Sequence, residues 1–222
     1  MKLFERVDAV FFDWDGTLVD TVPFGLSVMN SFLSHRGKEE IRKKVYLTSP
    51  SLSVRDAFKS MFLPHEYEDA IRDFRLFLEK NTKKIVPFDS SYSVLKLLRS
   101  KSIPMGIVSN QYGDVLRRQV KELAWESYFC SITGSGDWEE DKPSPLPLVQ
   151  SLKTIGINPS TSVLFVGDSF VDMMCAGRAG CTPVSVGPQA ETFEGNFISF
   201  KNIFDFYDGI KCSIDNNFLG ER

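Results

Sequence analysis

The sequence has few of the residues that build zinc sites and disulfides. It contains two histidines, His35 and His65, and neither lies within four residues of a cysteine or of the other histidine. Zinc sites need such residues clustered at short spacing, so a zinc site of the usual kind is excluded. The four cysteines form no CxxC pair, and we expect them to be reduced and mostly buried. Catalysis must therefore use carboxylates, hydroxyls and lysine.

Long apolar runs and concentrated positive charge are also absent. No stretch approaches the ~18 uncharged apolar residues that span a bilayer. The early run from Ala9 to Phe12 is too short for the core of a signal peptide. The formal net charge of −3 gives no support for a nucleic-acid binder. We therefore predict a cytoplasmic protein with no membrane segment and no nucleic-acid partner.

The chain does contain short apolar runs that alternate with helical patterns. Helical spacing is found after a predicted N-cap at Asp89, and again across 115–123 and 148–152. The alternation predicts an α/β fold, a doubly wound parallel sheet with helices on both faces. A final strand and a short helix are expected to close the sheet. The predicted strands span 7–12, 104–108, 128–133, 162–166, 182–186 and, more weakly, 197–200.

The stretch from 22 to 87 breaks this alternation. It has no convincing strand, and apolar residues recur at helical spacing across 52–62 and 67–78. We predict a small all-α cap domain over 22–87, inserted into a core domain formed by 1–21 and 88–222. Basic residues outnumber acidic ones in the cap. A positive lid would suit an anionic substrate, although solvated helix faces would have the same composition.

The first of four chemical motifs, DWDGT, follows the first predicted strand. Residues i and i+2 of an extended segment project to the same side, so Asp13 and Asp15 should face one pocket. Ligand sites of open α/β sheets lie at this end of the strands. Two carboxylates facing an anionic phosphate require a cation, and Mg²⁺ prefers oxygen ligands. Asp13 could then attack phosphorus, while Asp15 donates a proton to the leaving oxygen and later takes one from water.

Three more motifs supply the other parts of such a site. Ser109 and Asn110 end the second predicted strand, where a hydroxyl can donate to a phosphate oxygen. Lys142, in DKPSP, offers a compact positive charge. Asp168, in GDSFVD, can complete the metal site, and Asp172 can support Lys142 or a metal-bound water. Each motif alone is often a turn, a surface residue or a helix cap. Their consistent order along the chain indicates one site.

These motifs together resemble the haloacid dehalogenase (HAD) superfamily, within it the phosphoglycolate phosphatase-like branch. DWDGTLVD resembles the family's DxDGTLxD, IVSN its hydrophobic-(Thr/Ser)-Asn signature, DKPSP its Lys-Pro-x-Pro and GDSFVD its GDxxxD. The insert matches the place and type of this branch's helical cap. The resemblance implies a HAD-like Rossmannoid core and Mg²⁺ as the cofactor.

The resemblance also implies a role for each carboxylate. Asp13 would be the nucleophile and a metal ligand. Asp15 would be the acid/base, with its backbone carbonyl on the metal. Asp168 would be the further metal ligand, and Asp172 would stand behind it.

The remaining implied roles concern the phosphoryl group and the cap. Ser109 and Asn110 would contact the phosphoryl group, and Lys142 would stabilise its charge. In this branch a cap loop often sets specificity, and it would lie here near 48–55. Arg55 is the candidate for holding a second anionic group of the substrate, although a surface arginine on a helix would look the same.

The function expected from these residues is hydrolysis of a small phosphate ester, phosphoglycolate-like or a sugar phosphate, through an aspartyl-phosphate on Asp13. A sugar phosphomutase of the same fold is an alternative, because the same four motifs serve both reactions. A non-catalytic phosphometabolite-binding protein is a second. Asp15 disfavours a dehalogenase or phosphonate hydrolase, since those relatives replace it. We expect a monomer or homodimer.

Overall fold

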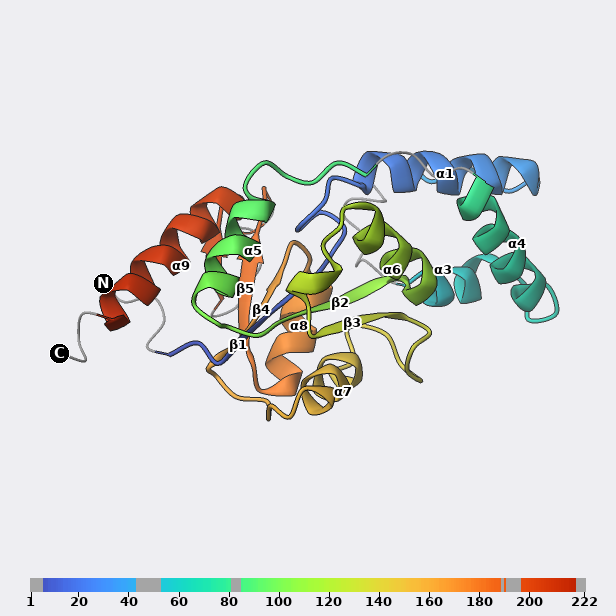
Figure 1. Ribbon diagram of the computed structural model, residues 1–222. Helices are drawn as coiled ribbons and strands as arrows, with labels where there is room; N and C mark the ends of the chain where they lie inside the picture. The colour runs from blue at the N-terminus through green and yellow to red at the C-terminus, as the bar shows by residue number, and fades with distance from the viewer. Residues whose placement is uncertain (1–5, 43–52, 81–84, 189, 191–196, 219–222) are drawn as a thin grey trace.

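The computed structural model describes residues 6–42, 53–80, 85–188, 190 and 197–218. Its centre is a sheet of six strands in the order β3-β2-β1-β4-β5-β6, with every neighbouring pair parallel (Figure 1). This confirms the predicted α/β fold. The strands are β1 (Ala9–Phe12), β2 (Met105–Tyr112), β3 (Ser131–Ser135), β4 (Val163–Gly167), β5 (Thr182–Val186) and β6 (Ile198–Phe200).

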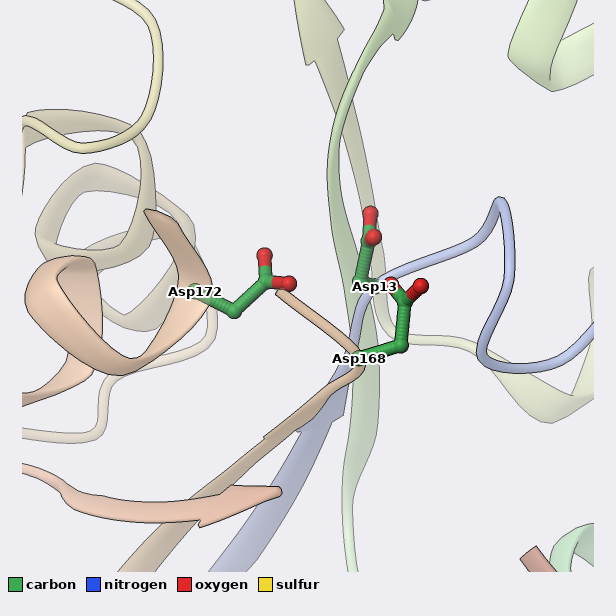
Figure 2. A group of neighbouring side chains, drawn as sticks. All are labelled: Asp13, Asp168 and Asp172. Carbon is green, nitrogen blue, oxygen red and sulfur yellow. The ribbon is translucent and has the colours of Figure 1, made fainter. Parts of the chain in front are cut away.

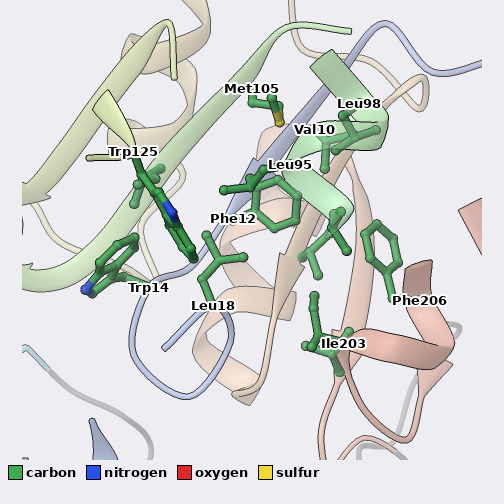
Figure 3. Close-up of a cluster of buried hydrophobic side chains, with 14 of the residues drawn as sticks. Val10, Phe12, Trp14, Leu18, Leu95, Leu98, Met105, Trp125, Ile203 and Phe206 are labelled. Atoms are coloured by element: carbon green, nitrogen blue, oxygen red, sulfur yellow. The ribbon is translucent and has the colours of Figure 1, made fainter. Parts of the chain in front are cut away.

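Helices cover both faces of the sheet, which explains why β1 is apolar at every position. Val10 and Phe12 belong to one buried cluster, whereas Ala9 and Phe11 belong to another. The first cluster takes apolar side chains from α5 (Ser91–Ser100), α6 (Gly113–Glu122) and α9 (Ile203–Phe218), and part of it is drawn in Figure 3. The second takes them from α7 (Leu146–Thr154) and α8 (Phe170–Ala179). The doubly wound arrangement is therefore confirmed.

Several predicted boundaries were wrong. β2 continues to Tyr112, four residues past its predicted end, so Ser109 and Asn110 lie within the strand. Its pairing with β3 shifts register in this part, which lets the strand continue past the irregularity. β3 starts only at Ser131 because 126–128 form a 3₁₀ turn. The predicted N-cap at Asp89 was also wrong, since α5 is preceded by Ser90, and the last helix is long, with 16 residues.

Among the described residues between β1 and α5 there are three helices: α1 (Val22–His35), α3 (Val54–Met61) and α4 (Tyr67–Lys80). Among the described residues between 22 and 80 there is no strand. These cap helices share a buried cluster rich in phenylalanine, in which the rings of Phe58 and Phe62 lie 4.9 Å apart. Tyr112 and Val115 of the core also belong to it, so the cap helices pack against α6. The domain limits at 21/22 and 87/88 stay a prediction.

Two expectations from composition have different outcomes. All four cysteines are free, but only Cys175 and Cys181 are buried. Cys130 and Cys212 are exposed, so the expectation of mostly buried thiols was wrong for half of them. In the part of the chain that the structure describes, no helix combines the length and apolar character needed to cross a membrane.

Candidate active site

The predicted motifs meet at the carboxyl ends of β1, β2 and β4. β1 pairs with β2 on one side and with β4 on the other, so the residues that end these strands come together. Asp13 directly follows β1, Ser109 lies in β2, and Asp168 directly follows β4. Parallel strands place their ligand sites at this edge. The sheet topology therefore joins segments more than 150 positions apart in the sequence.

Three carboxylates form the centre of the site. Asp13, Asp168 and Asp172 each offer one oxygen, and these oxygens lie within 4.8 Å of one another. Figure 2 shows Asp13 and Asp168 side by side, with Asp172 approaching from α8. Asp13 is 7% exposed, and Asp172 is fully buried. Because buried carboxylates at this separation repel each other, the cluster favours a bound cation.

Lys142 supplies one positive charge within this cluster. Its Nζ lies 2.8 Å from Oδ1 of Asp13 and 2.6 Å from Oδ1 of Asp172, and the residue is 2% exposed. The Asn110 side chain holds its backbone, donating to the Lys142 carbonyl and accepting from the Lys142 N–H, each at 3.0 Å. Contact with Lys142 is one of the two roles that the sequence suggested for Asp172, and the structure shows it. Asn110 as a phosphoryl contact stays a prediction.

Asp172 is fixed by the start of α8. Its Oδ2 accepts hydrogen bonds from the backbone N–H of Ser169, at 3.0 Å, and from the Ser169 hydroxyl, at 2.6 Å. Ser169 and Asp172 form a capping box, which satisfies backbone donors at the helix start. One oxygen of Asp172 therefore serves the helix, while the other faces Lys142.

The side chain of Asp15 lies apart from the carboxylate cluster. Its Oδ1 accepts a hydrogen bond from the Thr21 hydroxyl, and the Ser109 side chain also bonds to it. Trp14, between the two aspartates, points into the hydrophobic core instead. The chain bends at Trp14, and Asp15 is still near enough to Asp13 for its charge to act on that carboxyl. The Asp15 side chain is not part of the group formed by Asp13, Asp168 and Asp172, and its acid/base role stays a prediction.

Burial dominates the electrostatics of the site. It raises the pKa of Asp13 to about 7, with Lys142 opposing the shift and the charges of Asp172 and Asp15 adding to it. Burial also raises the pKa of Asp168 well above its ordinary value, helped by the charges of Asp13 and Asp172. For Lys142 burial alone would lower the pKa, but the two neighbouring carboxylates raise it. The site holds more negative charge than its single lysine can balance.

Two glycines allow the carboxylates to approach. Gly16 has a φ of +79°, and a Cβ at this position would lie 2.4 Å from Oδ2 of Asp168. A Cβ at Gly167 would lie 2.4 Å from the Cβ of Asp172. Since contacts this short are forbidden sterically, any side chain at either position would displace a carboxylate.

Arg55 lies on α3, away from the carboxylate cluster. Its guanidinium donates to the backbone carbonyls of Trp138 and Glu139, at 3.3 and 3.4 Å, and to Oδ1 of Asp141 at 3.5 Å. It therefore joins a cap helix to the loop that leads into Lys142. A contact between Arg55 and a second anionic group of the substrate stays a prediction. Residues 48–52 of the predicted cap loop lie outside the described residues.

Three polar residues of the site were not predicted from the sequence. Thr21 bonds to Asp15, Ser169 bonds to Asp172, and the Thr17 hydroxyl lies 3.5 Å from Oδ1 of Asp168. Ser169 and Asp172 carry a detectable signal, because serine with an acidic residue three positions later is typical of a helix start. Thr21 and Thr17 carry none, since their partners are set by the path of the loop.

The donor set fits Mg²⁺. Carboxylate oxygens from two segments of the chain, with a buried excess of negative charge, are the environment that hard divalent cations occupy. The described residues around the cluster provide no histidine or cysteine ligand, which zinc would prefer.

Comparison with known proteins agrees with this geometry. The family model described as haloacid dehalogenase-like hydrolase matches residues 10–186. A phosphoglycolate phosphatase of Neisseria gonorrhoeae is 30% identical over 194 residues, covering 82% of this chain and 80% of that protein. The pyrophosphatase PpaX of Bacillus pumilus is 27% identical, and the match covers 90% of this chain and 91% of that protein.

A solved structure extends this agreement to the whole fold. The HAD-superfamily hydrolase of Ehrlichia chaffeensis superimposes with a TM-score of 0.68 at 31% sequence identity, covering 95% of this chain and 99% of that chain. The matched family region runs from β1 to the end of β5 and so contains all four motifs. The chain therefore belongs to the haloacid dehalogenase-like hydrolase family.

Proposed function

We propose that this protein is a Mg²⁺-dependent phosphatase that hydrolyses a small phosphate ester through an aspartyl-phosphate on Asp13. The observation that supports this most is the buried Asp13 carboxylate, which contacts Lys142 and lies within 4.8 Å of oxygens from Asp168 and Asp172. A carboxylate held beside a cation site at the end of a parallel sheet is suited to attack an anionic phosphoryl group.

Asp13, Asp168 and the backbone carbonyl of Asp15 would hold the Mg²⁺ ion. When bound, the ion supplies positive charge that offsets the carboxylates and polarises the phosphoryl oxygens. Asp172 completes this environment by fixing Lys142. Removing its charge would leave the lysine with Asp13 as its remaining carboxylate partner.

The reaction proceeds in two displacements at phosphorus. An oxygen of Asp13 attacks, the bond between phosphorus and the ester oxygen breaks, and Asp15 protonates the departing oxygen. Asp15 then takes a proton from water, the water oxygen attacks phosphorus, and Asp13 is released together with inorganic phosphate. Lys142 faces Asp13 throughout and stabilises the charge that builds up on the transferred group.

We propose that Ser109 serves both steps. It is buried in β2 and bonds to the Asp15 side chain, so we propose that its hydroxyl contacts a phosphoryl oxygen. Asn110 contributes by placing Lys142, and we propose that it also contacts the phosphoryl group. Both residues belong to the part of β2 whose pairing with β3 is irregular.

We infer the substrate class from the cap helices and from the relatives. A cap over the site restricts access to small molecules and excludes bulk water. We propose phosphoglycolate or a sugar phosphate, with Arg55 on the cap holding a second anionic group. Pyrophosphate belongs in the test because two relatives are pyrophosphatases.

The test is release of inorganic phosphate by the purified protein after EDTA treatment and after addition of Mg²⁺. The panel contains 4-nitrophenyl phosphate, phosphoglycolate, pyrophosphate and sugar phosphates, and Asp13→Asn is the matched inactive control. Phosphate release that depends on Mg²⁺ and on Asp13 supports the proposal. A well-folded protein that hydrolyses none of these esters contradicts it.

The same panel separates the alternatives. A phosphomutase would convert one sugar phosphate into its isomer without free phosphate, which ³¹P NMR distinguishes directly. A binding protein without activity would bind a phosphometabolite but leave it unchanged. The cytoplasmic location and the monomeric or homodimeric state stay predictions.

A further inference from the structure

Trp14, the residue between the two motif aspartates, makes a specific buried contact with a distant helix. Its indole Nε1 donates a hydrogen bond to Oε1 of Gln119, at 2.7 Å, across 105 positions of sequence. Trp14 is fully buried, and Gln119, on α6, is 8% exposed. The bond therefore lies in the protein interior, where hydrogen bonds are strong and their loss is costly.

Trp14 is also the backbone anchor of the loop that carries the aspartates. Its carbonyl accepts the N–H groups of Leu18 and Val19, at 3.0 and 3.1 Å. The N–H of Gly16 donates back to the Val19 carbonyl at 2.9 Å. The loop thus closes around residue 14, so the orientation of this residue determines where its two neighbours point.

Ring packing and a directional hydrogen bond act together on this orientation. The Trp14 ring meets the Trp125 ring edge to face, with centroids 6.0 Å apart and an interplanar angle of 84°, and Figure 3 shows the two indoles beside Leu18. An edge-to-face contact is a preferred arrangement of aromatic rings, so the packing already limits the orientation of the indole. The Nε1 bond is directional, so it selects the one ring orientation that points the indole N–H at α6.

The helix that carries Gln119 is itself held in place. At its first turn Asp114 pairs with Arg75 of α4, at 2.6 Å. Val115 packs in the phenylalanine-rich cluster of the cap helices. Leu116 and Val120 pack in the buried cluster that α6 shares with α5 and α9. A side chain on such a firmly packed element can define a position more accurately than one on a loop.

We infer that Gln119 is a positioning residue for the catalytic loop: by holding the Trp14 indole it sets the directions of Asp13 and Asp15. Asp13 and Asp15 flank Trp14 directly in the chain, at a bend of the backbone, so a rotation at Trp14 would move both aspartates. The catalytic part of this inference rests on the proposed function, whereas the metal-binding part needs only the carboxylate cluster.

The decisive variant is Gln119→Met, which keeps the side-chain length and removes the acceptor. Gln150→Met, on α7, is the matched control. Magnesium affinity is measured by isothermal titration calorimetry, and kcat and KM are measured with the best phosphate ester of the panel. We expect Gln119→Met to lose about tenfold in magnesium affinity and in kcat, as supporting residues of metal sites commonly do. KM should change less than about twofold, and the control should match the wild type.

A second variant tests the same bond from its other end. Trp14→Phe removes the donor and should show the same losses. Combined with Gln119→Met it should be no more than about twofold worse than Trp14→Phe alone, because both changes remove one interaction. If Gln119→Met does not fold, the magnesium affinity of Trp14→Phe alone tests the inference.

Two results overturn the inference. One is a folded Gln119→Met protein with wild-type magnesium affinity and kcat, which would leave the bond a purely structural role. The other is a double variant whose losses multiply. If the wild type releases no phosphate from any ester, the proposed function fails, yet calorimetry still tests the positioning of Asp13.

Discussion

Replacing the nucleophile should stabilise the metal-free protein while abolishing its activity. Asparagine has the shape of aspartate and keeps an oxygen that can accept from Nζ of Lys142, which lies 2.8 Å from Asp13. The substitution removes one negative charge from a buried cluster that contains Asp168 and Asp172. A neutral amide is too weak a nucleophile to form the acyl-phosphate. Activity should therefore fall below detection.

The size of the stabilisation follows from the pKa of Asp13. Burial raises this pKa from 3.8 to about 7, so the folded state holds its proton to higher pH than the unfolded chain. The contribution of Asp13 to stability is therefore fully present below pH 3.8 and is lost as the pH rises through 7. At about 1.4 kcal/mol per unit, ionisation at pH 7.5 costs the folded state about 4 kcal/mol. At pH 5 the cost is about 2 kcal/mol by the same arithmetic.

Urea denaturation in EDTA measures this difference. Asp13→Asn should exceed the wild type in free energy of unfolding by up to about 4 kcal/mol at pH 7.5 and by about half of that at pH 5. Asp208→Asn, on the exposed face of α9, is the matched control and should change little at either pH. An Asp13→Asn protein that is less stable than the wild type at pH 7.5 would refute the electrostatic account of the site.

Three further outcomes follow from the same geometry. Asp15→Asn should lose at least about 100-fold in kcat, and the loss should be larger with alkyl than with aryl phosphates, because poor leaving groups need the proton most. Equal losses across leaving groups in steady-state assays would contradict this prediction. Lys142→Met should lower the free energy of unfolding in EDTA by about 3–5 kcal/mol, since it leaves two buried carboxylates without their cation. Urea titration measures this loss, and an unchanged unfolding midpoint would argue against the ion pairs. Magnesium at 100 times its dissociation constant should raise the wild-type free energy of unfolding by about 2.7 kcal/mol, and no shift in thermal scans would exclude the proposed metal site.

The sequence alone determined the sheet and the order of its motifs. Hydrophobicity and turn residues are local signals, so the short apolar runs located all six strands to within a few residues. Parallel strands bring their carboxyl ends to one edge, and that rule was enough to place Asp13 and Asp168 near each other. The contact of Asp172 with Lys142 was one of two alternatives that the sequence left open.

Other features were decided only by the tertiary structure. The end of β2 depends on irregular pairing with β3, and the partner of Asp15 depends on where the loop brings Thr21. Gln119 has no pattern that links it to Trp14, because the two residues are 105 positions apart and each has an ordinary local sequence. Side-chain hydrogen bonds depend on atoms meeting within about 3 Å at the right angle. Local sequence sets which segments form, but that distance and angle arise only when the segments pack together.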